Sequence, residues 1–315
     1  MHNGGWIMAN YICIDGGTTN TRVNLVCERK LIDSMKFNVG ARSGIDNKSL
    51  LRTTIRDGIA QLLSRNSMDK ADIAMILASG MITSEFGLVE LPHALLPAGM
   101  DEMHASMHKV VLDDISDIPF VFMRGVKTSA DTLESADMMR GEETELMGLY
   151  SEEGVYILPG SHSKIIKTNA KGQIVDFTTM LTGEMFSALS QGTILKDAVI
   201  LSDFEVDKES LMQGYQYCLK NGINEAPFKA RILKNIFKQE PAVIYNFYMG
   251  VILCGEVKYV LAQDPPKIVI GGKRQFKQSL AVILRELTSA VVVEIPEDEV
   301  DASSCLGMIR IFEHS

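Results

Sequence analysis

A turn rich in glycine and hydroxyl side chains follows the first apolar segment of the chain. Residues 11–22 read YICIDGGTTNTR, so an apolar run leads directly into Asp15, Gly16 and Gly17. Glycine can adopt positive φ and lets backbone N–H groups approach a polyphosphate. The pattern therefore predicts a phosphate-binding turn, which Thr18, Thr19 and Asn20 complete. An Asp-Gly hairpin turn with nothing bound explains the same residues about equally well, because such turns are common.

Asp15 is the candidate metal ligand of this turn. Mg²⁺ is a hard cation that prefers oxygen ligands, often through water, and a carboxylate next to a phosphate turn suits it. Apolar residues resume after the turn, at 23, 25 and 26. Their spacing predicts a second strand rather than a helix, and so a β-hairpin with the phosphate turn at its tip.

A second unit of the same plan begins near residue 155. A strand over 155–158 runs into the turn PGSHSK at 159–164, and strands over 165–168 and 174–179 follow. Because a strand, a glycine turn and two more strands also occur near residue 11, the repetition predicts two related domains. Gly80 and Met81, after the apolar run 72–78, mark another strand-to-loop edge of the kind where ligands bind.

The remaining elements give an α/β pattern. Further strands are predicted over 34–39, 119–124, 267–270 and 290–294, and helices over 49–65, 140–150 and 303–312, with a mostly helical region at 185–262 and an acidic loop at 297–301. Pro241 stands near the start of a long apolar helix over 242–262.

Composition narrows the class of protein. The 315 residues are enough for two domains, and 46% hydrophobic with 23% charged residues is ordinary for a globular enzyme. The net charge of −9 argues against nucleic acid as the main partner. No apolar run is long enough to span a membrane, and the first residues lack the features of a secretory signal. Five cysteines without a CxxC pair favour reduced thiols and a cytoplasmic protein.

Two other kinds of site lose support. His104 and His108 are spaced four apart beside acidic residues, which would suit a zinc pair on a helix, but no third ligand is indicated and a solvated helix face is the better interpretation. The sequence contains neither GxxxxGK followed by Ser or Thr nor a GxGxxG that opens a helix, so P-loop and Rossmann sites lose their main support.

Five segments together resemble one family. They are IDGGTTN at 14–20, SGM at 79–81, MRGEET at 139–144, LPGSHSK at 158–164 and MLTGE at 180–184. In this order they are similar to the 2-dehydro-3-deoxygalactonokinase family of the actin/hexokinase ATPase superfamily. The chain departs from that family at Gly16, where an aromatic residue is frequent, and over 185–262, which matches little of the family pattern.

The resemblance implies a fold and a division into domains. The fold class is α/β, a two-domain actin-like ATPase (ribonuclease H-like) fold with a duplicated mixed-sheet core and an interdomain cleft. An N-terminal domain over 8–130, joined by the closing helix 303–313, would carry the first phosphate loop. A C-terminal domain over 131–302 would carry the second phosphate loop, with Gly160 and Ser161, and the adenosine site at Gly271 and Gly272.

The resemblance also implies a catalytic carboxylate at the start of the helix before the second phosphate turn. Glu142 is the first candidate base for a hydroxyl acceptor and Glu143 the second. A helix N-terminus stabilises negative charge, which favours a carboxylate there. Two glutamates that merely cap a helix remain the alternative.

The implied substrate carries its own carboxylate, so an anion site is expected. Arg140, His162 and Lys164 flank glycine turns and are candidates for it. Arg22 is expected to face the triphosphate, or else to be a surface residue of a strand ladder. Thr182 and Glu184 suit sugar hydroxyls or the Mg²⁺ shell, and a plain helix cap explains them nearly as well.

The function implied is that of an ATP- and Mg²⁺-dependent sugar-acid kinase, which phosphorylates the C6 hydroxyl of 2-dehydro-3-deoxy-D-galactonate in galactonate catabolism. A kinase of the same superfamily acting on another sugar or a short carboxylate is the first alternative. A non-catalytic, sugar-sensing regulator is the second. The partners are the small-molecule substrate and ATP, without nucleic acid or membrane, and the sequence allows a homodimer without deciding it.

Overall fold

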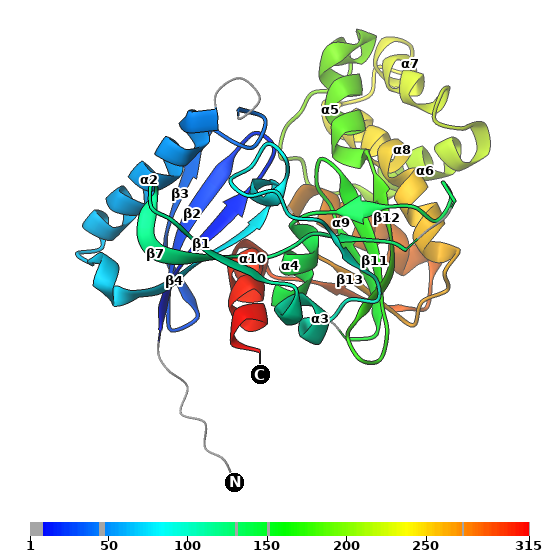
Figure 1. The fold of residues 1–315 in the computed structure, drawn as a ribbon. Coiled ribbons are helices and arrows are strands. Elements are labelled where there is room, and N and C mark those ends of the chain that lie inside the picture. Colours follow the sequence, from blue (N-terminus) through cyan, green and yellow to red (C-terminus); the bar gives the residue numbers. More distant parts are fainter. Residues whose placement is uncertain (1–8, 44–47, 130–131, 150–151, 273, 315) are drawn as a thin grey trace. The chain divides into compact units, whose positions relative to one another are not determined.

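The computed structural model describes residues 9–43, 48–129, 132–149, 152–272 and 274–314, and they form two compact units. Unit 1 holds the chain up to Glu152 together with Ala170–Asp176 and the segment from Asp298 onward; unit 2 holds Glu153–Asn169 and Phe177–Glu297. Figure 1 shows the elements of both. The expected domain limits at residues 8, 130 and 131 lie outside the described residues. The division at Glu152 differs from the expected one, because residues 132–149 belong with unit 1.

A six-stranded sheet forms the centre of unit 1, in the order β3-β2-β1-β4-β7-β6. The strands are β1 (Asn10–Gly16), β2 (Thr21–Cys27), β3 (Lys30–Phe37), β4 (Ile73–Gly80), β6 (His108–Leu112) and β7 (Ser116–Phe122). β1 pairs antiparallel with β2 and parallel with β4, and β4 pairs parallel with β7. The predicted hairpin around residues 15–20 is therefore confirmed.

Helices cover this sheet, and three short strands complete unit 1. The helices are α2 (Lys48–Arg65), η1 (Lys70–Asp72), η2 (Met81–Thr83), α3 (Met100–Ala105), α4 (Glu142–Gly148) and α10 (Glu297–Glu313), and the short strands are β5 (Ala94–Leu95), β8 (Val126–Lys127) and β9 (Met138–Met139). Ile12 and Ile14 of β1 pack in one core cluster with apolar residues of α2, whereas Tyr11 and Cys13, which alternate with them, contact α10. This alternation explains why β1 is apolar on both faces.

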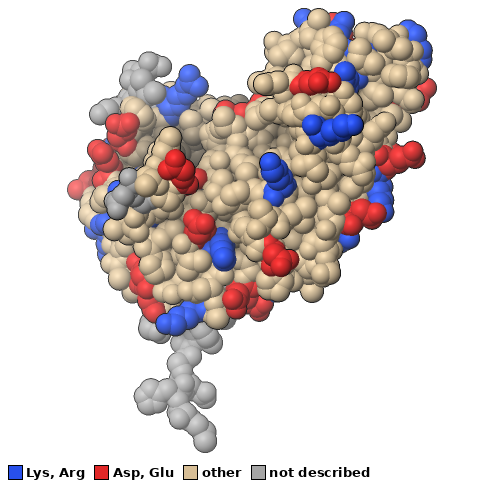
Figure 2. Space-filling model, turned by 90° about the vertical axis from the view of Figure 1, so that its right-hand side faces the viewer, with Lys and Arg blue, Asp and Glu red and all other residues tan. Residues whose placement is uncertain are grey.

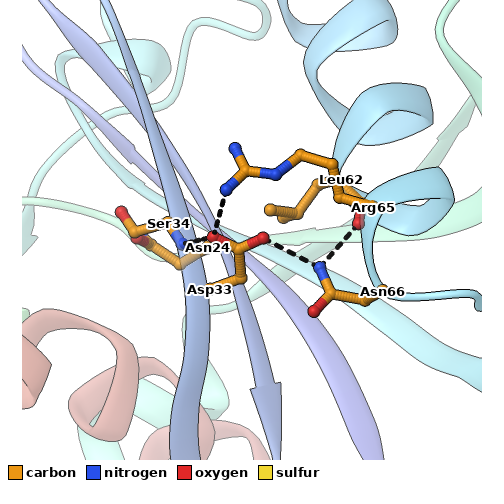
Figure 3. A network of polar contacts seen from close by, with 6 residues as sticks. All are labelled: Asn24, Asp33, Ser34, Leu62, Arg65 and Asn66. Carbon is orange, nitrogen blue, oxygen red and sulfur yellow. Dashed lines mark hydrogen bonds and ion pairs between the residues drawn. The ribbon is translucent and has the colours of Figure 1, made fainter.

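A polar network fixes the C-terminal end of α2 on the hairpin (Figure 3). The Asp33 carboxylate on β3 accepts hydrogen bonds from Arg65 and Asn66 at 3.2 and 2.9 Å, and Asn66 also donates to the Leu62 carbonyl at 2.8 Å. Ser34 donates to Asn24 at 2.6 Å. Hydrogen bonding from Asn66 lowers the pKa of Asp33. The network thus connects α2 with the strands that lead to the first turn.

Unit 2 repeats the sheet order of unit 1. Its five strands follow the order β12-β11-β10-β13-β14, with β10 antiparallel to β11 and parallel to β13. The bounds are β10 (Gly154–Leu158), β11 (Ser163–Thr168), β12 (Ile174–Met180), β13 (Lys267–Ile270) and β14 (Val291–Glu294). Two hairpin-linked strands followed by parallel strands occur in both units, which confirms the predicted duplication of the sheet.

The helices of unit 2 pack around the apolar α8. They are α5 (Thr182–Gly192), η3 (Ile194–Asp197), α6 (Lys208–Asn221), η4 (Ala226–Phe228), α7 (Lys229–Asn235), α8 (Pro241–Leu261) and α9 (Arg274–Leu287). Gly214 of α6 and Gly250 of α8 lie at the crossing of these two helices, where a Cβ on either would come within 2.0 Å of a carbonyl oxygen of the other helix. Glycine therefore sets how closely α6 and α8 approach.

Two predictions of secondary structure were wrong. The expected acidic loop at 297–301 forms the first turns of α10, because acidic residues at a helix N-terminus interact favourably with the helix dipole. His104 and His108 do not share a helix face, since α3 ends at Ala105 and His108 begins β6.

Two observations concern the surface. No helix among the described residues is long and apolar enough to cross a membrane. On the face drawn in Figure 2, the described Lys and Arg side chains are interspersed with Asp and Glu. That face is therefore mixed in charge rather than basic.

Candidate active site

Backbone hydrogen bonds fix the first turn, and the residues at its tip are exposed. The Gly17 N–H donates to the Asn20 carbonyl at 2.8 Å and closes the turn. The carbonyls of Gly17 and Thr18 accept the N–H groups of Ala41 and Arg42 at 3.0 and 2.9 Å. Thr18 and Thr19 are exposed. The turn is thus a fixed scaffold with accessible hydroxyls at its end.

Glycine is needed here for packing rather than for positive φ. Neither Gly16 nor Gly17 has positive φ, contrary to the expectation from sequence. A Cβ on Gly16 would lie 2.6 Å from the Ile82 Cβ, so only glycine fits. Positive φ occurs instead at Gly80, at +86°, where a Cβ would lie 2.5 Å from the Gly16 carbonyl oxygen. Gly16 and Gly80 are neighbours in the β1–β4 register, so the two predicted segments meet at this edge of the sheet.

Asp15 and Arg22 face each other across the hairpin. They are paired residues in the β1–β2 register, and the Arg22 Nη1 lies 3.9 Å from the Asp15 Oδ2. Burial raises the pKa of the Asp15 carboxyl, Arg22 opposes the rise and Glu142 adds to it. Both side chains retain access to solvent, with 35% of the Asp15 and 48% of the Arg22 side chain exposed. An arginine beside a partly exposed carboxylate can donate hydrogen bonds to phosphate oxygens.

The second set of predicted site residues in unit 1 begins at a glycine with positive φ. Gly141 precedes α4 with φ at +116°, and a Cβ on it would lie 3.3 Å from the Gly80 Cα. The Glu142 Oε2 accepts the Arg140 backbone N–H at 3.1 Å. Gly80 is also the register partner of Gly16, so the turn at Gly141 lies next to the end of β1. The structure thus brings together the first turn, Gly80 and Glu142.

Glu143 points into the protein, whereas Glu142 is only partly buried. Glu143 is fully buried; its Oε2 accepts the Gly141 N–H at 2.7 Å and its Oε1 accepts the Thr144 hydroxyl at 3.0 Å. Burial, followed by repulsion from Glu142, raises the pKa of Glu143 to about 8. A side chain with both oxygens engaged and no solvent access holds the turn at Gly141 and is poorly placed to take a proton from a substrate.

Glu145 is a member of this group that the sequence prediction missed. It lies three residues after Glu142 and therefore on the same side of α4. Burial and then repulsion from Glu142 and Asp15 raise its pKa to about 8. The i,i+3 spacing was the signal that could have identified it. Among the described residues, no group of three or more His, Cys, Asp or Glu is arranged to hold a metal ion by itself.

The Arg140 guanidinium binds the segment at 83–93. Its Nη1 donates to the Thr83 carbonyl and hydroxyl at 2.9 and 2.5 Å, and its Nη2 contacts the Leu91 carbonyl and the His93 Nδ1 at 3.2 and 3.3 Å. Burial and then the charge of Arg140 lower the pKa of His93 to about 4, so the ring is neutral and can accept. Arg140, expected to bind a substrate carboxylate, therefore has both terminal nitrogens engaged within the protein.

Arg124 is a basic residue that sequence reasoning missed. It lies two residues after the end of β7, and the N–H of the intervening Met123 donates to the Ala78 carbonyl at 2.8 Å, so Arg124 lies at the edge of the sheet that carries Gly80. Its Nε is buried and has no hydrogen-bond partner among the described residues. No sequence signal distinguished it, because a single arginine after a strand is common.

The second turn, in unit 2, is also fixed by contacts with a neighbouring segment. Gly160, Ser161 and His162 are exposed, whereas Ser163 is fully buried. The Ser161 carbonyl accepts the Glu184 N–H at 3.1 Å, and a Cβ on Gly183 would lie 2.3 Å from the Gly160 carbonyl oxygen. The structure therefore brings the predicted segments 159–164 and 180–184 together, with the first turn of α5 against the glycine turn.

The other predicted residues of unit 2 have distinct partners. The His162 Nε2 lies 3.0 Å from the Glu184 Oε1 at the surface, and Lys164 is buried at 4% exposure. The Thr182 hydroxyl donates to Glu256 of α8, so it is engaged inside the protein rather than free for a sugar. Glu256 was not predicted; a lone buried charge in an apolar helix was the available signal.

Gly271 and Gly272 follow β13 beside the second turn. The Gly271 N–H donates to the Ile157 carbonyl at 2.9 Å. Gly272 has φ at +73°, and a Cβ on it would lie 2.6 Å from the Pro159 carbonyl oxygen. Both glycines thus contact the strand and the proline that lead into Gly160. The adenosine role expected for them stays a prediction.

Comparisons with known proteins decide the family. The model of the family described as 2-keto-3-deoxy-galactonokinase matches residues 15–309. The chain belongs to this family. A curated "Probable 2-dehydro-3-deoxygalactonokinase" of Rhizobium meliloti (strain 1021) is 28% identical over 206 residues, which span 61% of this chain and 60% of that relative.

Solved structures agree on the fold. A crystal structure assigned as a 2-dehydro-3-deoxygalactonokinase from Sinorhizobium meliloti has a TM-score of 0.75 at 20% identity, over 97% of this chain and 98% of that one. Component A of the Acidaminococcus fermentans (R)-2-hydroxyglutaryl-CoA dehydratase has a TM-score of 0.50 at 13% identity, over 96% and 97%. The predicted fold class, an α/β actin-like ATPase fold with mixed sheets, is confirmed.

Proposed function

We propose that the chain is an ATP-dependent kinase that transfers a phosphoryl group to the C6 hydroxyl of 2-dehydro-3-deoxy-D-galactonate, in cytoplasmic galactonate catabolism. The observation that carries the proposal is the position of Glu142, directly after the Gly141 turn that packs on Gly80 beside the end of β1, in a chain whose family is 2-keto-3-deoxy-galactonokinase. Phosphoryl transfer needs positioning and charge neutralisation, and these segments supply groups suited to both.

Glu142 is proposed as the general base. It is only partly buried, whereas Glu143 is closed off and engaged on both oxygens. The Arg140 N–H fixes the Glu142 carboxylate through one oxygen. A carboxylate held in this way can orient the acceptor hydroxyl and take its proton.

ATP and Mg²⁺ are proposed as cofactors, and the residues present fit them. The first turn, from Asp15 to Asn20, and the second turn, with Gly160 and Ser161, each have an exposed tip suited to phosphates. The proposal also assigns Gly271 and Gly272 to the adenosine. Mg²⁺ keeps several waters and binds through one or two carboxylates plus phosphate oxygens, and the partly exposed Asp15 carboxylate at the first turn suits this role. Bound Mg²⁺ would neutralise charge on the phosphates.

The substrate carboxylate needs a cation, and the structure narrows the choice. In unit 1, Arg124 has an unpartnered Nε near Gly80, whereas the terminal nitrogens of Arg140 are engaged. In unit 2, His162 is exposed beside Glu184. We therefore propose that Arg124 and His162 are the first to test as direct ligands, and that Arg140 and Lys164 act from within the protein. Gly80 and Met81 would then border the sugar.

A substrate panel tests the proposal. ADP formation is coupled to NADH oxidation with 2-dehydro-3-deoxygalactonate, its gluconate epimer, galactonate, glucose and N-acetylmannosamine as acceptors. The proposal expects the keto-deoxy sugar acids to give the highest kcat/KM. Turnover of a neutral hexose without turnover of any keto-deoxy acid would refute it in favour of another sugar kinase.

A further inference from the structure

Glu256 is a buried carboxyl group in an otherwise apolar part of α8. Its neighbours Cys254, Val257 and Val260 are buried apolar residues, and Glu256 itself is 1% exposed. A buried carboxyl costs free energy unless hydrogen bonds compensate it. Natural sequences break the local pattern in this way mainly at functional sites, so the position calls for an explanation.

The hydrogen-bond partner of Glu256 begins the helix that packs on the second turn. The Thr182 hydroxyl donates to the Glu256 Oε1, whereas the Oε2 is buried and has no hydrogen-bond partner among the described residues. Burial raises the pKa of Glu256, and the hydroxyls of Ser163 and Thr182 oppose the rise. Thr182 is the first residue of α5, whose Glu184 N–H donates to the Ser161 carbonyl. Glu256 on α8 therefore fixes the start of α5 against the glycine turn.

The turn has a buried side and an exposed side. On the buried side, Ser163 is 0% and Thr182 is 5% exposed, and the Thr182 hydroxyl donates to Glu256. The Gly160 N–H donates to the Ser163 hydroxyl at 3.4 Å, so the glycine is hydrogen-bonded to the buried side of the turn. On the other side, Gly160 and Ser161 are exposed. The group that fixes the turn therefore leaves its exposed backbone accessible to a ligand.

We propose that Glu256 is a positioning residue for the nucleotide phosphates, which acts through Thr182 at the start of α5 and does not touch the ligand. The inference rests on the proposed ATP-dependent kinase function. A phosphate site made of backbone N–H groups binds well only if the turn is already ordered. Without the Glu256 carboxyl group, the Thr182 hydroxyl loses its acceptor, and the start of α5, which packs on Gly160 and donates to the Ser161 carbonyl, is less firmly fixed. ATP binding must then supply the free energy that orders the turn.

The test measures nucleotide affinity by isothermal titration calorimetry with Mg²⁺ and the non-hydrolysable analogue AMPPNP. Glu256→Met, which removes the acceptor, and Thr182→Val are each expected to weaken AMPPNP binding about tenfold. The double variant is expected to bind no more weakly than either single variant, because both substitutions break the same contact. Thr182→Ser, which keeps the hydroxyl, is expected to restore the affinity.

Thr178→Val is the matched control. The Thr178 hydroxyl donates to the Tyr259 hydroxyl at 2.7 Å, so it also forms a hydrogen bond with α8, but from β12 rather than from the start of α5. This variant is expected to bind AMPPNP like the wild type. Equal weakening in Thr178→Val and Thr182→Val would show a general loosening of α8 and would overturn the inference.

Wild-type affinity in Glu256→Met would also overturn the inference. If that variant does not fold, the comparison of Thr182→Val with Thr182→Ser decides, and equal affinities in this pair refute the role. The KM for the sugar acid is expected to stay within about twofold of wild type, since the effect is confined to the nucleotide. Because AMPPNP binding is measured without sugar, failure of the sugar panel would refute the proposed substrate and leave this inference standing.

Discussion

Replacing Glu142 and Glu143 of α4 one at a time separates an effect on catalysis from an effect on stability. Glu142→Gln removes the proposed base but keeps the size of the side chain and one acceptor oxygen for the Arg140 N–H. General base catalysis contributes about 10²–10⁴-fold, or about 3–5 kcal/mol of transition-state stabilisation. We expect kcat to fall by at least about 100-fold, with an unchanged melting temperature and an unchanged AMPPNP affinity.

Glu143→Gln is expected to act on stability. The carboxyl group is hydrogen-bonded to the Gly141 N–H at 2.7 Å and to the Thr144 hydroxyl at 3.0 Å, and glutamine puts an amino group with two N–H donors in place of one of its oxygens. One buried donor then lacks a partner, which costs about 1–3 kcal/mol of unfolding free energy. Urea unfolding measures this loss, and the coupled ADP assay is expected to show that the folded fraction keeps a much larger kcat than Glu142→Gln.

Glu299→Gln is the matched control, because Glu299 is an exposed glutamate in the first turn of another helix of unit 1. It is expected to change neither kcat nor stability. A kcat for Glu142→Gln within about threefold of wild type would remove Glu142 from its role. A 100-fold loss of kcat in a fully stable Glu143→Gln protein would make Glu143 the base instead.

Four further outcomes follow from the same contacts. The pKa of Glu143 is raised from 4.5 to about 8, so the folded state binds more protons between these values; unfolding free energy should therefore fall as pH rises from 5 to 8, and less steeply in Glu143→Gln. Arg140→Met should lose four hydrogen bonds and speed hydrogen exchange over residues 81–93, whereas unchanged exchange would contradict the role of Arg140 in holding this segment. Gly183→Ala puts a Cβ 2.3 Å from the Gly160 carbonyl oxygen, so the KM for ATP should rise at least about tenfold; an unchanged KM would separate this contact from the nucleotide site. EDTA should abolish turnover reversibly and leave the melting temperature of the ATP-free protein unchanged, and full activity without divalent metal would refute the Mg²⁺ requirement.

Local patterns predicted the parts of the fold that depend on neighbours in sequence. The hairpin whose turn follows Asp15, the apolar strand β4 and the repeated sheet order all follow from apolar spacing and turn residues. The acidic segment 297–301 did not, because a run of acidic residues suits a loop and a helix N-terminus equally.

Contacts between distant segments determined the rest. The need for glycine at position 16 comes from Ile82, and the engagement of Arg140 comes from residues 83–93. Glu142 and Glu143 are adjacent, yet consecutive helical side chains point about 100° apart, so only the structure shows which one is buried. Glu145 and Glu256 left signals in the sequence, namely an i,i+3 spacing and a lone charge in an apolar helix.

The position of the phosphate on the product tests the central claim most directly. The protein is incubated with ATP, Mg²⁺ and 2-dehydro-3-deoxy-D-galactonate, and the product is analysed by ³¹P–¹H correlation NMR. The account predicts one phosphomonoester signal, correlated with the protons on C6 and equal in amount to the ADP formed. ADP with inorganic phosphate and no sugar phosphate, or a phosphate correlated with another carbon, would contradict it.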